Sequence, residues 1–277
     1  MTTIADTTVR GTAAVYDLAP GAVARGQNFF VQWLEGTPEV EARSEHEMLL
    51  LLPDTGAELR TAAGRRAVPG RSICVLPAGR VAVYLAQGGR AALIASSRPD
   101  LASGSACNQA DYAVPDSRIL PSAAGYRRVT GQGEVQVIAV DNIAPPADKP
   151  RLKMFQSDTL GINWVEYDGP RDRSQLSPHS HADFEQASLA IAGNYVHHLR
   201  VQWGPDANHW QDDQHLPAGS PSMITVPVNL IHTTEGVGAG RHLLIDVFSP
   251  PRSDFIGRGW VANAHEYVRD AGEPGER

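Results

Sequence analysis

Short apolar segments recur along the chain, and glycine or proline separates most of them. Twenty prolines and 26 glycines punctuate the 277 residues. Many short strands with regular turn signals are typical of a sandwich, a jelly roll or a barrel. We therefore predict an all-β protein. The expected strands are Met48–Leu52, Ser72–Leu76, Val81–Leu85, Ala91–Ala95, Val135–Val140, Tyr195–Trp203, Met223–Val226 and Leu243–Phe248.

Helical patterns are scarce, and the best candidate is the stretch Ser253–Asp270 near the C-terminus. Its apolar residues Phe255, Trp260 and Val261 are available to dock against the rest of the protein. We therefore expect one short C-terminal helix.

A proline-rich segment divides the chain. Ile143–Pro150 reads IAPPADKP, and such a segment forms a stiff, extended connector. We predict an N-terminal arm at 1–27, a first domain with its connector at 28–142, a linker at 143–151 and a second domain at 152–277. Nine of the ten histidines follow the boundary, so chemistry that needs imidazole is expected in the second half.

The two halves share a spacing of residues and look like copies of one plan. Glycine and asparagine are the residues that best tolerate positive φ, so both copies are expected to turn tightly after the proline. By the same alignment, Glu41, Arg43 and Glu47 stand where the second half has His179, His181 and Glu185. The first half should therefore lack a set of metal ligands. The shared order is Gly70, Pro77, Gly79, Ala82 in the first half and Gly219, Pro227, Asn229, His232 in the second.

The segment PHSHADFE carries the chemistry that we consider most informative. His179 and His181 are two residues apart, and residues i and i+2 of a strand point to one face. Glu185 can join them only if the chain turns near Ala182 and Asp183 and comes back. With His232 from a distant strand, nitrogen and carboxylate ligands of this kind suit a first-row divalent metal. The alternative is a set of surface histidines on a polar strand.

These two segments resemble the motifs of the cupin superfamily. The first motif of that family is His-x-His, three or four residues, Glu, about six residues and Gly. Here His179, His181, Glu185 and Gly193 follow it, with seven residues in the last gap. The second motif, Pro-x-Gly-x-x-His-x-x-x-Asn, is similar to the run from Pro227 to Gly236, in which Asn229 replaces the glycine and Gly236 the asparagine.

The resemblance implies two double-stranded β-helix domains in tandem, of which only the second holds a metal. It extends over about 152–255 well and over about 28–97 weakly. It implies the ligand set His179, His181, Glu185 and His232, but it does not specify the reaction, since cupins include enzymes of many classes and non-enzymatic binders.

We favour a mononuclear non-haem Fe(II) dioxygenase that acts on a small organic acid or phenol. Mn, Ni, Zn, Co or Cu are alternative ions. The alternative functions are a redox-neutral isomerase, lyase or hydrolase of a keto or sugar acid, and a non-enzymatic binding protein.

Further site candidates lie after the first motif. In YVHHLRVQW, Tyr195, Leu199, Val201 and Trp203 share one face, while Val196, His198, Arg200 and Gln202 share the other. The second face either meets solvent or lines the mouth of the barrel. In the latter case His198 and Arg200 join Glu185 in catalysis, and Gln202 contacts substrate. The long polar connection that follows is either a surface hairpin or a lid whose His209 and Trp210 bind substrate.

Charge and composition narrow the remaining choices. A net charge of −7 argues against a nucleic-acid partner, and no apolar run is long enough to span a bilayer. We read no signal peptide at the N-terminus, and two cysteines indicate no disulfide framework, so a cytoplasmic location is expected. We also expect a homodimer, because the N-terminal arm and the apolar run Leu49–Pro53 both need cover.

Overall fold

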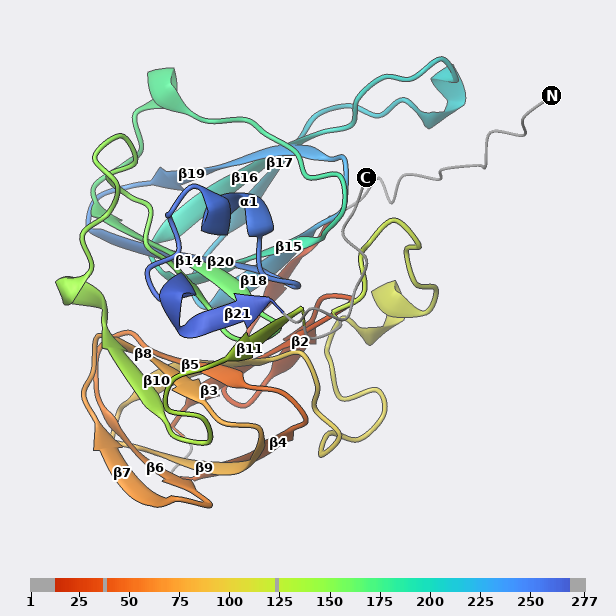
Figure 1. Cartoon of the computed structure of the whole chain (residues 1–277). Coiled ribbons are helices and arrows are strands. Elements are labelled where there is room, and N and C mark those ends of the chain that lie inside the picture. Colours follow the sequence, from red (N-terminus) through yellow and green to blue (C-terminus); the bar gives the residue numbers. More distant parts are fainter. Residues whose placement is uncertain (1–12, 37–38, 123–124, 270–277) are drawn as a thin grey trace.

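The computed structural model describes residues 13–36, 39–122 and 125–269, which fold into two β-barrels packed against each other (Figure 1). Each barrel pairs a six-stranded sheet with a smaller one. The all-β expectation and the tandem double-stranded β-helix architecture are confirmed. The expected strands all form, with ends that move by up to three residues.

The first barrel consists of a six-stranded sheet and a four-stranded sheet. Its larger sheet has the order β12 (Gln136–Ala139), β8 (Ser72–Leu76), β5 (Met48–Leu52), β10 (Arg90–Ala95), β3 (Phe30–Glu35) and β2 (Val23–Arg25). Its smaller sheet has the order β4 (Val40–Ser44), β9 (Gly79–Leu85), β6 (Ala57–Thr61) and β7 (Gly64–Val68).

The second barrel repeats this plan. Its larger sheet has the order β1 (Val15–Asp17), β18 (Ser222–Val226), β15 (Gln186–Ala192), β20 (Arg241–Phe248), β14 (Gly161–Asp168) and β13 (Met154–Gln156). Its smaller sheet has the order β17 (Gln214–Ala218), β16 (Asn194–Arg200) and β19 (Ile231–Val237).

Backbone geometry supports the internal alignment. Gly79 has a φ of 110° and Asn229 a φ of 64°, so both predicted turns adopt the left-handed conformation. Glu41 pairs with Ala82 across β4 and β9, as His179 pairs with His232 in an isolated antiparallel bridge. The two copies therefore place corresponding residues opposite each other.

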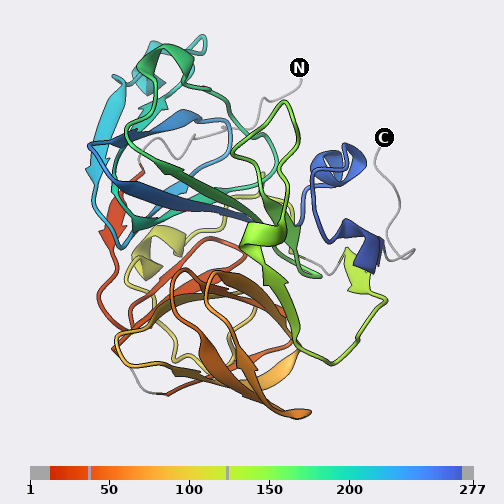
Figure 2. The same cartoon turned by 90° about the vertical axis from the view of Figure 1, so that its left-hand side faces the viewer.

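The two larger sheets face each other and share one apolar core. Leu49 and Leu51 of β5 enter this shared core together with Leu189 of β15 and Ile245 of β20. Leu50 and the other even positions of β5 fill the interior of the first barrel. The run of leucines is thus covered on both faces within one chain, because each barrel contributes one side of the cover. Figure 2 shows the two barrels packed one against the other.

The N-terminal arm crosses to the other barrel. β1 pairs with β18, with Val15 opposite Ile224, and Leu18 enters the shared core. Residues 1–12 of the arm lie outside the described part of the chain. Both features on which the dimer expectation rests therefore find cover inside the chain, and the homodimer stays a prediction.

The expected C-terminal helix is shorter than predicted. α1 spans Ser253–Gly257 and ends before Gly259, whose φ is 72°. Asp270, the predicted end, lies outside the described residues. Phe255, Trp260 and Val261 pack on Phe184 and Phe248, so the predicted docking is confirmed.

Four 3-10 turns lie on connections around the barrels and one precedes the last strand. They are η1 (Gln109–Tyr112), η2 (Val140–Asn142), η3 (Arg173–Gln175), η4 (Ala207–His209) and η5 (Ala264–Glu266). The last strand, β21 (Tyr267–Arg269), pairs with β11 (Tyr126–Arg128) and ties the tail to the connector between the domains. In the described residues, no helix has the length and apolar character needed to cross a membrane.

Candidate metal centre

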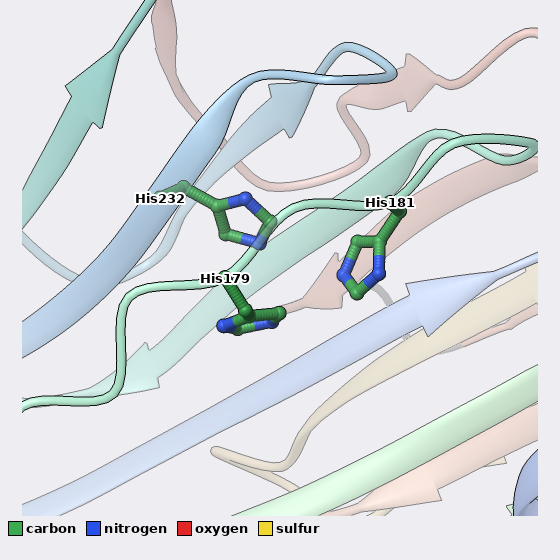
Figure 3. Close-up of side chains that lie close together, drawn as sticks. All are labelled: His179, His181 and His232. Carbon is green, nitrogen blue, oxygen red and sulfur yellow. The ribbon is translucent and has the colours of Figure 1, made fainter. Parts of the chain in front are cut away.

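Three histidines converge in the second barrel (Figure 3). His179 and His181 lie on the segment that leads into β15, and His232 lies near the start of β19. Backbone hydrogen bonds join His179 and His232 in both directions, at 3.1 and 2.8 Å. One ring nitrogen of each histidine lies within 4.8 Å of the others, which is close enough for one ion to contact all three.

The rings of His179 and His232 are held by backbone carbonyls. His179 Nδ1 lies 2.9 Å from the Ser177 oxygen, and His232 Nδ1 lies 2.9 Å from the Leu230 oxygen. A carbonyl only accepts hydrogen bonds, so each Nδ1 carries the proton and each Nε2 keeps its lone pair. This is the arrangement in which a metal-binding histidine is normally oriented.

The His232 Nε2 atom is the strongest sign that this group of histidines binds a ligand. It is buried, and it has no hydrogen-bond partner among the described residues. Buried polar atoms are nearly always paired, since an unpaired one costs about 1–3 kcal/mol. A divalent ion bound by the three imidazoles would satisfy this nitrogen.

His181 differs from the other two because both of its nitrogens have contacts. The Arg252 guanidinium donates to His181 Nδ1 at 3.1 Å, and His181 Nε2 lies 3.0 Å from Gln186 Oε1. The tautomer that satisfies both contacts carries its proton on Nε2. Binding an ion through Nε2 therefore requires this proton to move to Nδ1, and the hydrogen bonds of His181 with Gln186 and Arg252 are then both lost.

Two of the three imidazoles are neutral in the folded protein. Burial, together with the neighbouring histidines, lowers the pKa of His181 to about 3. Burial also lowers the pKa of His232 to about 4, aided by His179 and opposed by the Leu230 carbonyl. Neutral imidazoles have free lone pairs at neutral pH, so little proton release is needed when a metal binds.

Glu185 lies apart from the three histidines. Its carboxylate accepts hydrogen bonds from the Tyr112 hydroxyl at 2.8 Å and from the Gln27 backbone at 2.8 Å. These contacts join it to η1 and to the segment between β2 and β3. The residue next to it, Gln186, begins β15 and is the one that contacts His181.

Gln186 also explains the irregular spacing of the first motif. Four residues separate it from His181 and six separate it from Gly193, which matches the family pattern without the extra residue. Because side chains alternate along a strand, a shift by one residue moves a side chain to the other face. The position beside the histidines thus holds a neutral amide, where the sequence interpretation placed a carboxylate.

A polar wall continues from Gln186 into the barrel. Asp246 Oδ1 accepts hydrogen bonds from Ser188 at 2.8 Å and from Gln186 at 3.2 Å, and Asn163 donates to Oδ2 at 3.4 Å. Burial raises the pKa of Asp246, while the hydrogen bonds from Ser188 and Asn163 and the charge of His179 act in the opposite direction. A carboxyl group in this environment can hold or release a proton.

His197 was missed by the sequence interpretation. It is buried, its Nδ1 lies 2.9 Å from Thr234 Oγ1, and burial lowers its pKa to about 4, with smaller contributions from His232 and His198. The alternation of YVHHLRVQW could have found it, because His197 shares the face of Tyr195 and Leu199. A histidine among apolar residues on the inward face is a signal for the site.

His198 and Arg200 lie on the face of β16 opposite to His197. Their polar contacts are with residues other than the three histidines. Arg200 forms an ion pair with Asp213 at 2.6 Å, and His198 contacts Glu235 and His215. Both line an open pocket of about 300 Å³ that also touches His232. Their predicted role in catalysis stays a prediction.

Gln202, His209 and Trp210 lie on the connection between β16 and β17, which projects from the second barrel (Figure 1). Trp210 stacks on Trp203 with ring centres 4.6 Å apart, and its indole nitrogen donates to the Gly204 oxygen. His209 lies beside Asp206, and Gln202 is exposed. The contacts given for His209 and Trp210 are thus made within the projecting loop, and substrate binding by the three residues stays a prediction.

The corresponding positions of the first barrel hold other chemistry. Glu41 is exposed beside Arg60 and Arg80, and Arg43 is exposed as well. Glu47 is buried. Its carboxylate accepts a hydrogen bond from the Tyr267 hydroxyl at 2.8 Å and forms an ion pair with Arg128 at 3.0 Å. The contact of Glu47 with Tyr267 attaches the C-terminal strand to the first barrel.

The chain matches no protein-family model and no curated protein. Among solved structures it is similar to AerE from Microcystis aeruginosa, with 10% identity and a TM-score of 0.52 over 88% of this chain and 99% of that one. It is also similar to an IolB-like protein from Salmonella typhimurium, with 12% identity and a TM-score of 0.54 over 93% and 96%. Likeness at these identities shows the fold, over nearly the whole of each chain.

Proposed function

Since this chain has the two-domain fold of the cupin superfamily and a three-histidine group in its second barrel, we propose that it is a metal-dependent enzyme. The leading candidate is a mononuclear Fe(II) dioxygenase that acts on a small polar organic acid or phenol. The observation that carries the proposal is the buried, unpartnered Nε2 of His232, which lies within reach of His179 and His181.

The donor set fits a first-row divalent ion. Imidazole nitrogen is a common ligand for Fe, Co, Ni, Cu, Zn and Mn, and three protein ligands leave further coordination positions for other molecules. When bound, the ion would supply Lewis acidity and, in the case of iron, electrons for dioxygen chemistry. An imidazole carries no charge when it binds a metal, so the charge of the ion would remain to attract an anionic substrate.

The residues around the histidines suit a small polar substrate. His179 is exposed and His232 is buried, so the group extends from the surface into the barrel. Gln186 and Asn163 offer amide groups, and Ser188 offers a hydroxyl. These side chains could orient carboxylate or hydroxyl oxygens of a substrate, which is the specificity that a few convergent polar groups provide in a pocket.

A redox-neutral function is the second candidate, and Asp246 is the observation that favours it. A carboxyl group with a raised pKa beside the metal ligands could exchange protons with a keto or sugar acid, as an isomerase, lyase or hydrolase requires. In that case the ion would act only as a Lewis acid. A non-enzymatic binding protein would use the same group without turnover.

Elemental analysis and anaerobic assays separate these candidates. The protein would be purified without added metal, and its metal content compared with that of His232→Ala and of His265→Ala, a control whose side chain is 76% exposed. The iron-loaded protein would then be incubated with a panel of small phenols and hydroxy or keto acids, with an oxygen electrode as the readout.

Oxygen uptake that depends on substrate, and that is lost in His232→Ala, would support the dioxygenase. Turnover in the absence of oxygen would replace it with the redox-neutral candidate. Equal metal content in the wild type and in His232→Ala would overturn both enzymatic candidates, because the ion would then be bound elsewhere.

A further inference from the structure

A second group of imidazoles lies on the outer face of the smaller sheet of the second barrel. His198 of β16 and His215 of β17 are opposite each other in the sheet, and their Nδ1 atoms are 2.7 Å apart. Glu235 of β19 lies behind them, with its Oε2 3.0 Å from His198 Nε2. We propose that His198 and His215 bind a second divalent cation between their Nδ1 atoms.

The outer site is separate from the three-histidine group. Leu199 is the register partner of His232, and His197 contacts Thr234, so the odd positions of β16 share the inward face with His232. His198 lies on the opposite face because side chains alternate along a strand. No ion could therefore contact both groups, and the two sites can be tested independently.

Glu235 fixes the tautomer that metal binding needs. Its carboxylate is only 7% exposed and accepts a hydrogen bond, so His198 Nε2 carries the proton and His198 Nδ1 keeps its lone pair. A histidine held by a carboxylate in this way is the usual outer partner of a metal ligand. In the absence of an ion, His215 Nδ1 must donate to His198 Nδ1, because two lone pairs at this distance would repel.

The pair is nearly at the separation that a metal requires. Two nitrogens each about 2.0–2.1 Å from one ion lie roughly 2.9–3.4 Å apart for angles from 90° to tetrahedral. The observed 2.7 Å is shorter by roughly 0.2–0.7 Å, depending on the angle at the ion. His215 is exposed and can move by that amount, while its proton transfers to Nε2, which can face solvent.

The surroundings allow an ion to enter and bind. His198 and His215 both line the open pocket of about 300 Å³. Asp213 lines the same pocket, and its carboxylate, which pairs with Arg200 at 2.6 Å, would supply a third ligand only by leaving that ion pair. Glu235 and Asp213 offset the charges of Arg173 and Arg200, which are 78% and 64% exposed and therefore well solvated.

The ligand chemistry selects the class of cation. Two imidazoles favour borderline ions such as Zn²⁺, Ni²⁺ or Cu²⁺ over Mg²⁺ and Ca²⁺, which prefer oxygen. Such an ion would link β16 to β17 at the base of the projecting loop that carries Trp203 and Trp210. It would thereby hold the two ends of this loop together.

Zinc titration of four proteins tests the second site. The wild type, His215→Ala, His232→Ala and the double variant would be stripped with a chelator, titrated with Zn²⁺ in a calorimeter and analysed for bound zinc. We expect two ions per chain in the wild type, one in each single variant and none in the double variant. His265→Ala is the matched control and should bind two.

Glu235→Gln provides a second measurement. Because it weakens the acceptor of His198 Nε2–H, we expect the affinity of the outer site to fall by about 10-fold or more, with the three-histidine site unchanged. Zinc binding in His215→Ala that equals the wild type in stoichiometry and affinity would overturn the proposal and leave a hydrogen-bonded pair only. If only His232→Ala loses zinc, the proposal of an outer site is likewise overturned. If only His215→Ala loses zinc, the three-histidine centre is overturned instead.

Discussion

Replacing His232 with alanine tests whether the three-histidine group binds metal without being needed for folding. Four-ligand zinc sites bind with about 10–16 kcal/mol, which is about 2.5–4 kcal/mol per ligand. Loss of one ligand should therefore weaken binding by roughly 10²–10³-fold. The substitution would be made in the His215→Ala background, so that the proposed outer site contributes nothing.

The expected change in stability of the metal-free protein is small. Truncation loses the bond from Nδ1 to the Leu230 carbonyl and leaves a small cavity, which together cost about 2–4 kcal/mol. It also removes the unpartnered Nε2, whose burial already costs about 1–3 kcal/mol. The two effects largely offset each other, so the free energies of unfolding should differ by no more than about 3 kcal/mol.

Urea unfolding with and without metal measures both effects. With free metal at about 100 times the dissociation constant, the parent protein should gain about 2.7 kcal/mol of stability. A variant whose affinity is 100-fold lower should gain only about 0.4 kcal/mol under the same conditions. His265→Ala in the same background should behave like the parent. If the His232→Ala variant kept more than about 2 kcal/mol of metal-dependent stabilisation, the ligand assignment would be wrong.

Four further predictions concern pH, catalysis, the buried ion pair of Arg128 with Glu47, and assembly. In the metal-free protein the pKa values of His181, His197 and His232 are depressed to between about 3 and 4, so the unfolded chain binds these protons first. The contribution of these neutral histidines to the free energy of unfolding should be complete above about pH 6.5 and be lost as the pH falls toward 4. Urea midpoints should therefore fall between pH 7 and pH 5, and they should fall less in His232→Ala. Asp246→Asn should retain its metal but lower kcat by about 100-fold or more and remove one limb of the pH profile, if this carboxyl transfers a proton; an unchanged profile would exclude that role. Arg128→Met should lower the free energy of unfolding by about 3–5 kcal/mol, because it leaves the buried Glu47 carboxylate without its cation, and adding Glu47→Gln should restore part of the loss. Light scattering during gel filtration should show a homodimer, and a single peak at the chain mass of 29.8 kDa across micromolar loading would rule it out.

The sequence by itself determined the strands, the repeat and three of the four residues proposed as metal ligands. Alternation and turn residues act locally, so β5 and β8 form with the predicted ends. The left-handed turn at Asn229 also follows from local sterics, since few residues tolerate positive φ. The sequence also placed His179 and His181 with His232. The two barrels repeat one plan, in which the segment before β5 or β15 pairs with the strand that carries Ala82 or His232.

The tertiary structure alone decided which side chain stands beside the three histidines. Glu185 and Gln186 differ by one position, and only the pairing of β15 with β18 and β20 shows that Gln186 begins the strand. The same is true of His197 and His198, whose faces depend on how β16 lies against β19. A strand has a period of two, so one residue of register reverses every assignment to inside or outside.

Contacts between distant segments were likewise beyond the reach of the sequence. The arm strand β1 joins the second barrel and the run of leucines in β5 is covered by that barrel, although both looked like surfaces for a second chain. Apolar residues show that a surface must be buried, but they carry no information on which partner buries it. That choice depends on the summed packing of the whole fold, which no local pattern encodes.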